Sequence, residues 1–325
     1  MDERLSESEI DRTDSLGESA RESIRRESEI ANRYWGGVEW RIVLTFAVCA
    51  TVWTTVLVLG IRGDIPLPVG FLLNVVIAPT FYMPMHESVH GNISGRVGRM
   101  RWLNELVGKL AAVPLIMGHS MHRSSHMRHH AFTNDPARDP DIVTRGRLSE
   151  LPKKWFGLAL LNSFLPLFAF VPPFRLLLPG VMRRAMAESR DGGRPGRDGK
   201  ALFRQWLVTH IVLAACFASG IGVPALVLWY LPARIQMLWL MTVFAWYPHH
   251  PADRSGRYVD TRVAVFPGSG FLIRGHDHHA VHHLYPRIPH YRLRRAWQEL
   301  AGELVPKGVR SEGSATGATR PVVWS

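Results

Sequence analysis

The chain has 325 residues, of which 46% are hydrophobic and 20% are charged, and its formal net charge at pH 7 is +12. Residues 1–36 hold ten acidic and six basic residues, so the other 289 residues carry a net charge of +16 together with all the long uncharged runs. This combination indicates contact with an anionic membrane surface and excludes nucleic acid as the expected partner.

The two cysteines, Cys49 and Cys216, both lie inside apolar runs. This excludes a disulfide scaffold, a Cys-rich zinc module and an iron–sulfur cluster held by this chain. Histidine, by contrast, is abundant. The chain has 16 histidines, and most of them fall in a few short groups.

The N-terminal residues 1–36 form a polar segment rich in Ser and Glu, which we expect to be mobile or to form a surface helix. We expect no cleavable signal, because 41 mostly polar residues precede the first apolar run.

Residues 42–61 and 65–85 are uncharged runs that are each long enough to cross a bilayer as a helix. The loop between them is so short that they must form a hairpin. Residues 205–222 and 225–247 form a second pair of apolar runs, separated by a Gly-containing break at 220–224. The sequence therefore predicts an all-α integral membrane protein with about four transmembrane helices in two hairpins, which make up one domain at residues 37–305.

The apolar run at residues 155–174 contains Pro166, Pro172 and Pro173. If the histidine groups before and after the second hairpin share one site, an even number of crossings must separate them. The basic residues of 183–204 favour a cytoplasmic position for that loop. We therefore expect 155–174 to be a Pro-broken helix in the membrane interface that does not cross, with both termini and a histidine-rich cap in the cytoplasm. Residues 306–325 have the composition of a disordered tail.

Three histidine groups lie near the ends of the apolar runs. His86 and His90 are four residues apart, which places both imidazoles on one face of a helix. The other two groups share the pattern H-x-x-H-H; they are His126, His129 and His130, and then His279, His282 and His283.

Eight imidazoles at one membrane face have no rationale in packing, because each buried ring nitrogen needs a partner. We therefore predict a metal site, and this many nitrogen donors suit two ions of a metal such as iron, zinc or copper. His210 lies in the middle of a span and is expected to be a hydrogen-bonding group between helices instead. Acidic residues near the groups are candidates to orient the imidazoles; they are Glu87, Asp135, Asp139, Asp141 and Asp277.

The motifs HESVH, HMRHH and HHAVHH, in this order and at these distances from the spans, resemble those of the membrane fatty-acid desaturase/hydroxylase superfamily. The resemblance covers roughly residues 40–300, and the segments HHAFTNDPARDPD and HDHHAVHHLYPRIPHYRL strengthen it.

The resemblance implies a non-haem di-iron centre, O2 as co-substrate and an external electron donor such as ferredoxin or a reductase. It assigns iron-ligand roles to His86, His90, His126, His129, His130, His279, His282 and His283. Some relatives also use a histidine just beyond the last span, and either His249 or His250 occupies that place. His122 is a further possible ligand, and the roles of His276 and His278 are open.

The implied reaction is oxidation of an unactivated C–H bond of a lipid. The first hypothesis is a fatty acyl desaturase that acts on acyl-lipid or acyl-CoA. The alternative hypothesis is a carotenoid hydroxylase or ketolase that acts on β-carotene. An alkane hydroxylase fits less well, and so does a non-catalytic metal transporter, since the spans contain few ionisable groups. Apolar residues that could line a slot for the substrate include Trp53, Phe81, Phe244 and Trp246.

Overall fold

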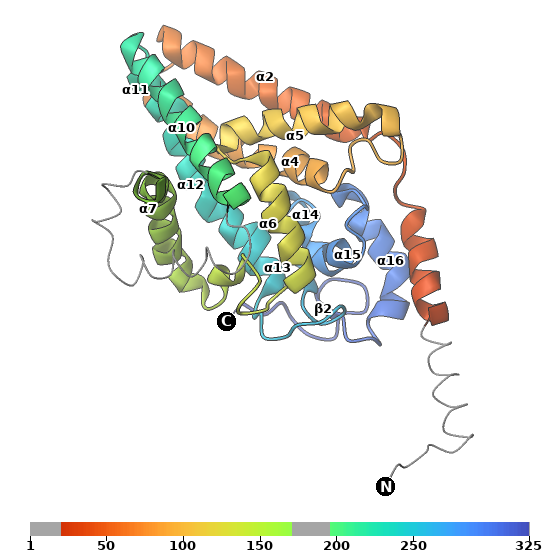
Figure 1. Ribbon diagram of the computed structural model, residues 1–325. Coiled ribbons are helices and arrows are strands. Elements are labelled where there is room, and N and C mark those ends of the chain that lie inside the picture. Colours follow the sequence, from red (N-terminus) through yellow and green to blue (C-terminus); the bar gives the residue numbers. More distant parts are fainter. Residues whose placement is uncertain (1–20, 171–195, 325) are drawn as a thin grey trace, which may run out of the picture.

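The computed structural model describes residues 21–170 and 196–324, and it is mostly helical (Figure 1). A helix at residues 21–32 comes first. The longer helices that follow are α2 (Trp40–Arg62), α3 (Leu67–Ile77), α4 (Tyr82–Val89), α5 (Arg101–Leu115), α6 (His119–Phe132), α7 (Leu151–Phe170), α10 (Gly196–Ala218), α12 (Leu231–Leu240) and α16 (Leu293–Leu304). The short helices are α11 (Gly222–Ala225), α13 (Tyr247–His249), α14 (Ser269–Leu272) and α15 (His279–Leu284), and the strands are β1 (Arg262–Val265) and β2 (Arg310–Gly313).

Four helical stretches of the described chain are long and apolar enough to cross a membrane, as predicted: Trp40–Arg62, Leu67–Val89, Ala201–Ala218 and Gly222–His249. The second and fourth stretches extend past the predicted ends at 85 and 247, and so include His86 and His249. The apolar pattern stops before these histidines, but the backbone hydrogen bonding of the helix does not depend on side-chain polarity. The last turns of two long helices therefore supply imidazoles to the same region.

The helix α7 is not among these four stretches. It continues through Pro166 as far as Phe170, whereas the sequence predicted a break there. The end of the predicted run, residues 171–174, lies outside the described residues. The helix α7 contacts α10 and α12.

The long helices pack closely where glycine replaces a side chain. A Cβ atom at Gly60 of α2 or Gly70 of α3 would lie 2.5 or 2.6 Å from a methyl carbon of Leu228. Leu228 belongs to a π-helical segment at Leu226–Tyr230, and its carbonyl oxygen accepts a hydrogen bond of 2.7 Å from the buried Asn74 side chain. The π-helical hydrogen-bond pattern thus leaves the Leu228 carbonyl oxygen able to accept a further hydrogen bond, and Asn74 of α3 donates it.

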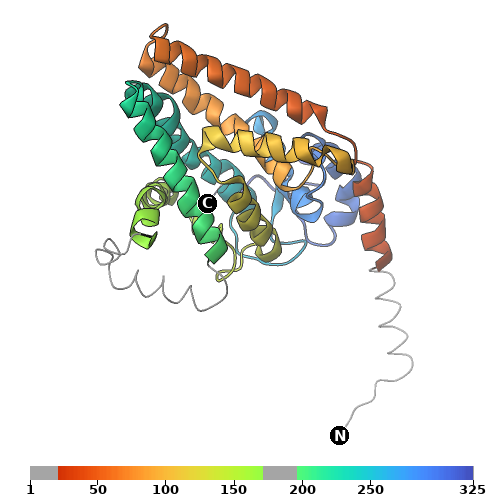
Figure 2. The same cartoon turned by 45° about the horizontal axis from the view of Figure 1, so that its top comes forward.

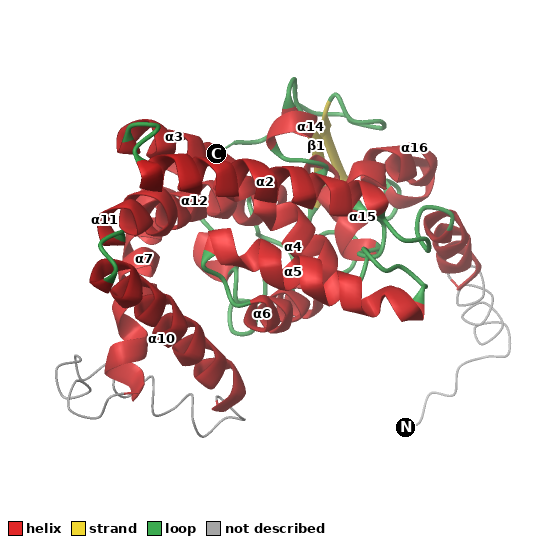
Figure 3. Ribbon diagram, turned by 90° about the horizontal axis from the view of Figure 1, so that it is seen from above, coloured by secondary structure: helices red, strands yellow, loops and turns green. Residues whose placement is uncertain are grey.

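The helices α13–α16 and the helix at 21–32 gather at one end of the long helices, seen from two further directions in Figures 2 and 3. The helix at 21–32 lies beside α16 at this end (Figure 1). Its fully buried Glu27 accepts a hydrogen bond of 2.6 Å from the Tyr285 hydroxyl and pairs with Lys307. Of the two states expected for residues 1–36, the described part is therefore a packed surface helix.

The C-terminal residues differ from the expected disordered tail. Strand β2 pairs in parallel with β1, in the register Arg262 to Arg310. The Arg262 guanidinium is buried, donates to a Glu312 carboxylate oxygen across 2.8 Å, and also donates to the Tyr247 carbonyl oxygen. A buried arginine needs such partners. The tail is ordered because it supplies the counter-charge for Arg262, a relationship that its own composition does not reveal, and the fold accordingly includes a small two-stranded sheet.

Candidate metal centre

Four helical segments bring the histidine groups together. His86 lies in α4 and His90 directly follows it, and α6 supplies His126, His129 and His130. His249 ends α13, and α15 supplies His279, His282 and His283. The spacings of three and four residues place the rings of each helix on one face, as the sequence predicted.

The structure arranges eight of these side chains in two groups, each with its ligating atoms within 4.8 Å of one another. The first group is His86, His90, His126 and His282, and the second is His129, His249, His279 and His283. In the first group the Nε2 atom of His126 lies 3.0 Å from that of His86 and 2.9 Å from that of His90. In the second, the Nε2 atom of His249 lies 3.1 Å from that of His129 and 3.0 Å from that of His279.

His130 lies beside the first group and contacts two of its members. Its Nε2 atom lies 3.0 Å from that of His126 and 3.1 Å from that of His282. The ring of His130 also stacks on that of His283 in the second group, with centroids 4.2 Å apart. His130 therefore lies between the two groups.

The spacing of these nitrogen atoms fits a metal ion. Imidazole nitrogens lie about 2.1 Å from a bound transition-metal ion, so neighbouring ligands at right angles are about 3.0 Å apart. Neighbouring Nε2 atoms in each group have this separation: His86 and His126, His90 and His126, His129 and His249, and His249 and His279. A set made only of imidazole nitrogens suits iron, zinc or copper and disfavours magnesium or calcium.

The surroundings keep most of these imidazoles neutral. Burial, with a smaller contribution from neighbouring histidines, lowers the pKa of His126, His130, His279, His282 and His283 well below its ordinary value. Burial also lowers the pKa of His90 to about 4. Neutral imidazole is the form that binds a metal, so the site is prepared for a cation near neutral pH.

Two side chains fix the orientation of the second group. Asp139 accepts a hydrogen bond of 2.8 Å from the His129 Nδ1–H group. Burial alone would lower the pKa of His129, but this hydrogen bond and the charge of Asp141 raise it. Thr133 donates to the His129 carbonyl oxygen across 2.7 Å, and its hydroxyl accepts from the His283 Nδ1–H group at 3.2 Å. Both bonds leave the Nε2 lone pair directed at the site. Sequence reasoning missed Thr133, and a threonine three residues after a histidine motif gives no distinctive signal.

The other acidic candidates lie further from the two groups. Asp141 has a carboxylate oxygen 3.8 Å from the His129 Nδ1 atom. Glu87 is buried and accepts hydrogen bonds from the backbone and the ring of His290 and from Asn92. Asp277 accepts from His278 and Ser269, and Asp135 pairs with Arg138. Among the described contacts, Asp139 is thus the carboxylate that bonds directly to a histidine of the two groups.

The structure distinguishes the neighbouring histidines that the sequence left open. His249 points into the second group, whereas His250 follows the end of α13 and its ring lies against Trp246 with centroids 4.5 Å apart. The sequence predicted that His210 bonds between helices, but its Nδ1–H group donates to the Trp206 carbonyl oxygen of its own helix, 2.8 Å away, and the described hydrogen bonds include none from His210 to another helix. His122 and His276 are near the first group but in neither set, with ring centroids 5.4 Å from His126 and 4.9 Å from His86 respectively.

An apolar cluster borders the first group. Tyr82 stacks on His86 with ring centroids 5.6 Å apart, and Phe244 meets His276 edge-on at 4.8 Å. Phe81 and Trp246 are buried in the same cluster and Trp53 packs against it. Three of the four slot candidates from the sequence, Phe81, Phe244 and Trp246, are therefore buried in the cluster that borders the site, and the partly buried Trp53 packs against that cluster.

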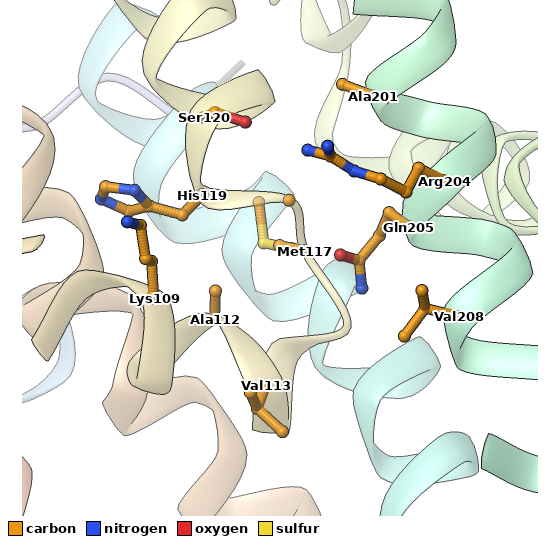
Figure 4. Close-up of a pocket in the computed structure, with 11 residues that line it drawn as sticks. Lys109, Ala112, Val113, Met117, His119, Ser120, Ala201, Arg204, Gln205 and Val208 are labelled. Carbon is orange, nitrogen blue, oxygen red and sulfur yellow. The ribbon is translucent and has the colours of Figure 1, made fainter. Parts of the chain in front are cut away.

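A cavity of about 310 Å³ opens between α5, α6 and α10 (Figure 4). In Figure 4, Arg204 and Gln205 extend from α10 towards Met117 and His119 on the opposite wall. Ala112 and Met117, which line it, also belong to or pack against the apolar cluster that contains Tyr82 and Phe244. The cavity thus has a basic side and an apolar wall that is continuous with the border of the histidine groups.

Comparison with known proteins identifies the family. The fatty acid desaturase family matches residues 65–312. The chain is 24% identical over 249 residues to an sn-1 acyl-lipid omega-3 desaturase (ferredoxin) of Synechocystis, which is 72% of this chain and 67% of that relative. It is 24% identical over 243 residues to a probable fatty acid desaturase of Sorghum bicolor, covering 70% of this chain and 61% of the relative. It is 26% identical over 223 residues to a dihydrorhizobitoxine desaturase of Bradyrhizobium elkanii, covering 65% of this chain and 61% of the relative.

The chain therefore spans only about two thirds of the length of these relatives. The family match nevertheless covers most of the described chain and includes every histidine of the two groups. With its four apolar helices and its converging imidazoles, the chain belongs to the fatty acid desaturase family.

Proposed function

We propose that this protein is an oxygen-dependent membrane oxidoreductase that introduces a double bond into a fatty acyl chain. The observation that carries the proposal is the pair of histidine groups, each with its nitrogen atoms within 4.8 Å, at the border of an apolar cluster. The names of the relatives support desaturation as the reaction.

The two histidine groups would each hold one iron ion. His86, His90, His126, His130 and His282 surround the first position, and His129, His249, His279 and His283 surround the second. When bound, the two irons supply the chemistry that activates O2 for the removal of hydrogen from a methylene group. Overall, –CH2–CH2– + O2 + 2 electrons + 2 H⁺ gives –CH=CH– + 2 H2O, so each turnover needs an external electron donor.

The chain's own residues position both partners of this reaction. Asp139 and Thr133 hold His129 and His283 in the tautomer that directs Nε2 at the metal. Tyr82 and Phe244 present an apolar surface beside His86 and His276, which would exclude water and hold a methylene group close to the site. The acyl chain would reach this surface from the cavity between α5 and α10, whose wall is continuous with it.

The proposed membrane arrangement rests on the four apolar stretches each crossing once. Four crossings return the chain to its starting side, so the segments before Trp40 and after His249 would share one face with the histidine groups. The excess of basic residues outside the spans favours the cytoplasm for that face. The donor would be a ferredoxin or a reductase on this side, and the name of the Synechocystis relative includes ferredoxin.

Lipid and pigment profiling tests the proposal. The chain is expressed with a ferredoxin system in a host that makes both membrane acyl lipids and β-carotene, beside the variants His283→Ala and His210→Ala. We expect new double bonds in acyl chains with the wild type and with His210→Ala, and none with His283→Ala. Hydroxylated or keto carotenoid with unchanged acyl chains would replace the proposed substrate with β-carotene. Double bonds formed by the His283→Ala variant would contradict the proposed site.

A further inference from the structure

We infer that an arginine-lined pocket beside His90 is the surface on which an acidic one-electron donor protein docks. This inference rests on the proposed function, since it concerns the electrons that the reaction consumes. The pocket has a volume of about 530 Å³ and lies between the segment before α2 and the loop that joins α4 to α5. We call it the arginine pocket and define it by Trp35, Arg96, Arg101, Arg123 and Arg287, with His90 in its wall.

The charge of the arginine pocket is strongly positive. Among the described residues that line it, the four arginines face a single carboxylate, that of Glu105. Glu105 is already paired with Arg123 at 2.9 Å. Among the described residues, no ion pair joins Arg96, Arg101 or Arg287 to a carboxylate. A concave surface with one sign of charge concentrates the electrostatic field and attracts a partner of the opposite charge.

The rim of the pocket is held in place by an aromatic ring. The guanidinium groups of Arg96 and Arg287 lie 4.2 and 4.8 Å from the centre of the Trp35 ring. Arg96 also donates a hydrogen bond of 3.0 Å to the Asn32 side chain. Two of the positive charges are thus presented in a fixed arrangement and not on freely moving side chains.

The pocket adjoins the first histidine group directly. His90 lines the pocket on one side, and on the other its Nε2 atom lies 2.9 Å from that of His126. One imidazole therefore separates a solvent-accessible, positively charged surface from the proposed metal position. This is a short path for an electron that arrives from outside.

The position in the fold also suits a soluble partner. Trp35 comes just before the first span and the residues from Gly91 to Arg101 follow the second, so the pocket lies at the histidine end of these two helices. Figure 3 shows that the loop between α2 and α3 is at the opposite end. The pocket accordingly faces the same aqueous side as the histidine groups.

A protein donor fits the pocket better than the head group of the substrate. Trp35 is the one large apolar residue in the described part of the lining. The described ring contacts of His90 are with other histidines, whereas the apolar cluster meets the site at His86 and His276 through Tyr82 and Phe244. If the pocket held the head group of the substrate, the acyl chain would begin on the His90 side of the histidines, away from the apolar cluster. The electrons and the substrate then take separate routes. Two donor molecules each deliver one electron on the His90 side, and the acyl chain enters on the side of the apolar cluster.

The test compares two charge-reversed variants of the full-length protein in lipid nanodiscs. Arg101→Glu with Arg287→Glu removes positive charge from the pocket, where both side chains are exposed. Arg294→Glu with Arg295→Glu makes the same change in charge at two exposed positions of α16. The probe is a [2Fe–2S] ferredoxin. Three quantities are measured: its binding by interferometry, turnover driven by reduced ferredoxin, and product formed when the protein is reduced with dithionite, freed of excess dithionite and exposed to O2 (dithionite-driven turnover).

We expect the pocket variant to weaken ferredoxin binding and raise the KM for ferredoxin by about tenfold, and the α16 variant to change either by less than about twofold. Dithionite-driven turnover should be unchanged in both. Unchanged ferredoxin binding in the pocket variant would overturn the inference. An equal loss of dithionite-driven turnover would overturn it too, since it would show that the pocket holds an anionic substrate. If the wild type forms no product with either reductant, the proposed function fails, and the binding comparison still decides whether the pocket docks ferredoxin.

Discussion

Asp139 accepts a 2.8 Å hydrogen bond from the Nδ1–H group of His129, and both side chains are almost fully buried. The bond fixes the tautomer of an imidazole whose other nitrogen faces His249 at 3.1 Å. Replacement of Asp139 by asparagine keeps the shape but presents an amide that can donate as well as accept.

We therefore predict that Asp139→Asn weakens the binding of iron at the second position by about 10- to 100-fold, as is typical when the partner of a metal-ligating histidine is lost. Titration of the metal-free protein with Fe²⁺ measures this directly. The matched control is Asp135→Asn, in the same loop, where the carboxylate pairs with the exposed Arg138. Equal affinity in the Asp139 and Asp135 variants would contradict the role given to Asp139.

The ion pair between Arg262 and Glu312 yields a prediction about stability. Both side chains are fully buried and their charged atoms are 2.8 Å apart. Glu312→Gln leaves an uncompensated guanidinium in the interior, which typically costs about 3–5 kcal/mol of the free energy of unfolding. Thermal unfolding in detergent should therefore show a clear loss of stability, and deletion of residues 306–325 should have a similar effect. A deletion variant as stable as the full chain would mean that the tail is dispensable, as its composition alone suggests.

The contact of Gly60 with Leu228 yields a prediction about helix packing. A methyl group at position 60 would overlap a Leu228 methyl carbon, so Gly60→Ala should destabilise the protein by about 1–3 kcal/mol. The second change Leu228→Ala should recover part of this loss in the double variant. Gly157→Ala in α7, where nothing lies within 4 Å of the added carbon, is the control. Additive effects of the Gly60 and Leu228 changes would show that the two residues do not meet.

Much of the site could be predicted from the sequence because helical periodicity alone aligns the histidines within each motif. His126, His129 and His130 need only one helix to share a face, and the same holds for His279, His282 and His283. The choice between His249 and His250 could not be made in this way. It depends on where α13 ends, and the structure ends that helix at His249.

The carboxylates and the tail were harder to predict because their partners lie far away in the sequence. Glu87 is next to a motif histidine, yet it bonds to His290, about 200 residues later. Thr133 bonds to His283, 150 residues away. The order of residues 310–313 depends on Arg262. Such long-range pairs are set by how the helices pack, and a single sequence gives periodicity and composition but not packing.

Iron content decides whether the two histidine groups bind two metal ions. It is measured on the purified 325-residue chain after reconstitution with Fe²⁺, beside the His279→Ala and His278→Ala variants. His279 belongs to the second histidine group, whereas its neighbour His278 bonds to Asp277. We expect two iron ions per chain in the wild type and in His278→Ala, and a loss of iron from the second position in His279→Ala. No stoichiometric iron in the wild type, or the same iron content in all three proteins, would contradict it.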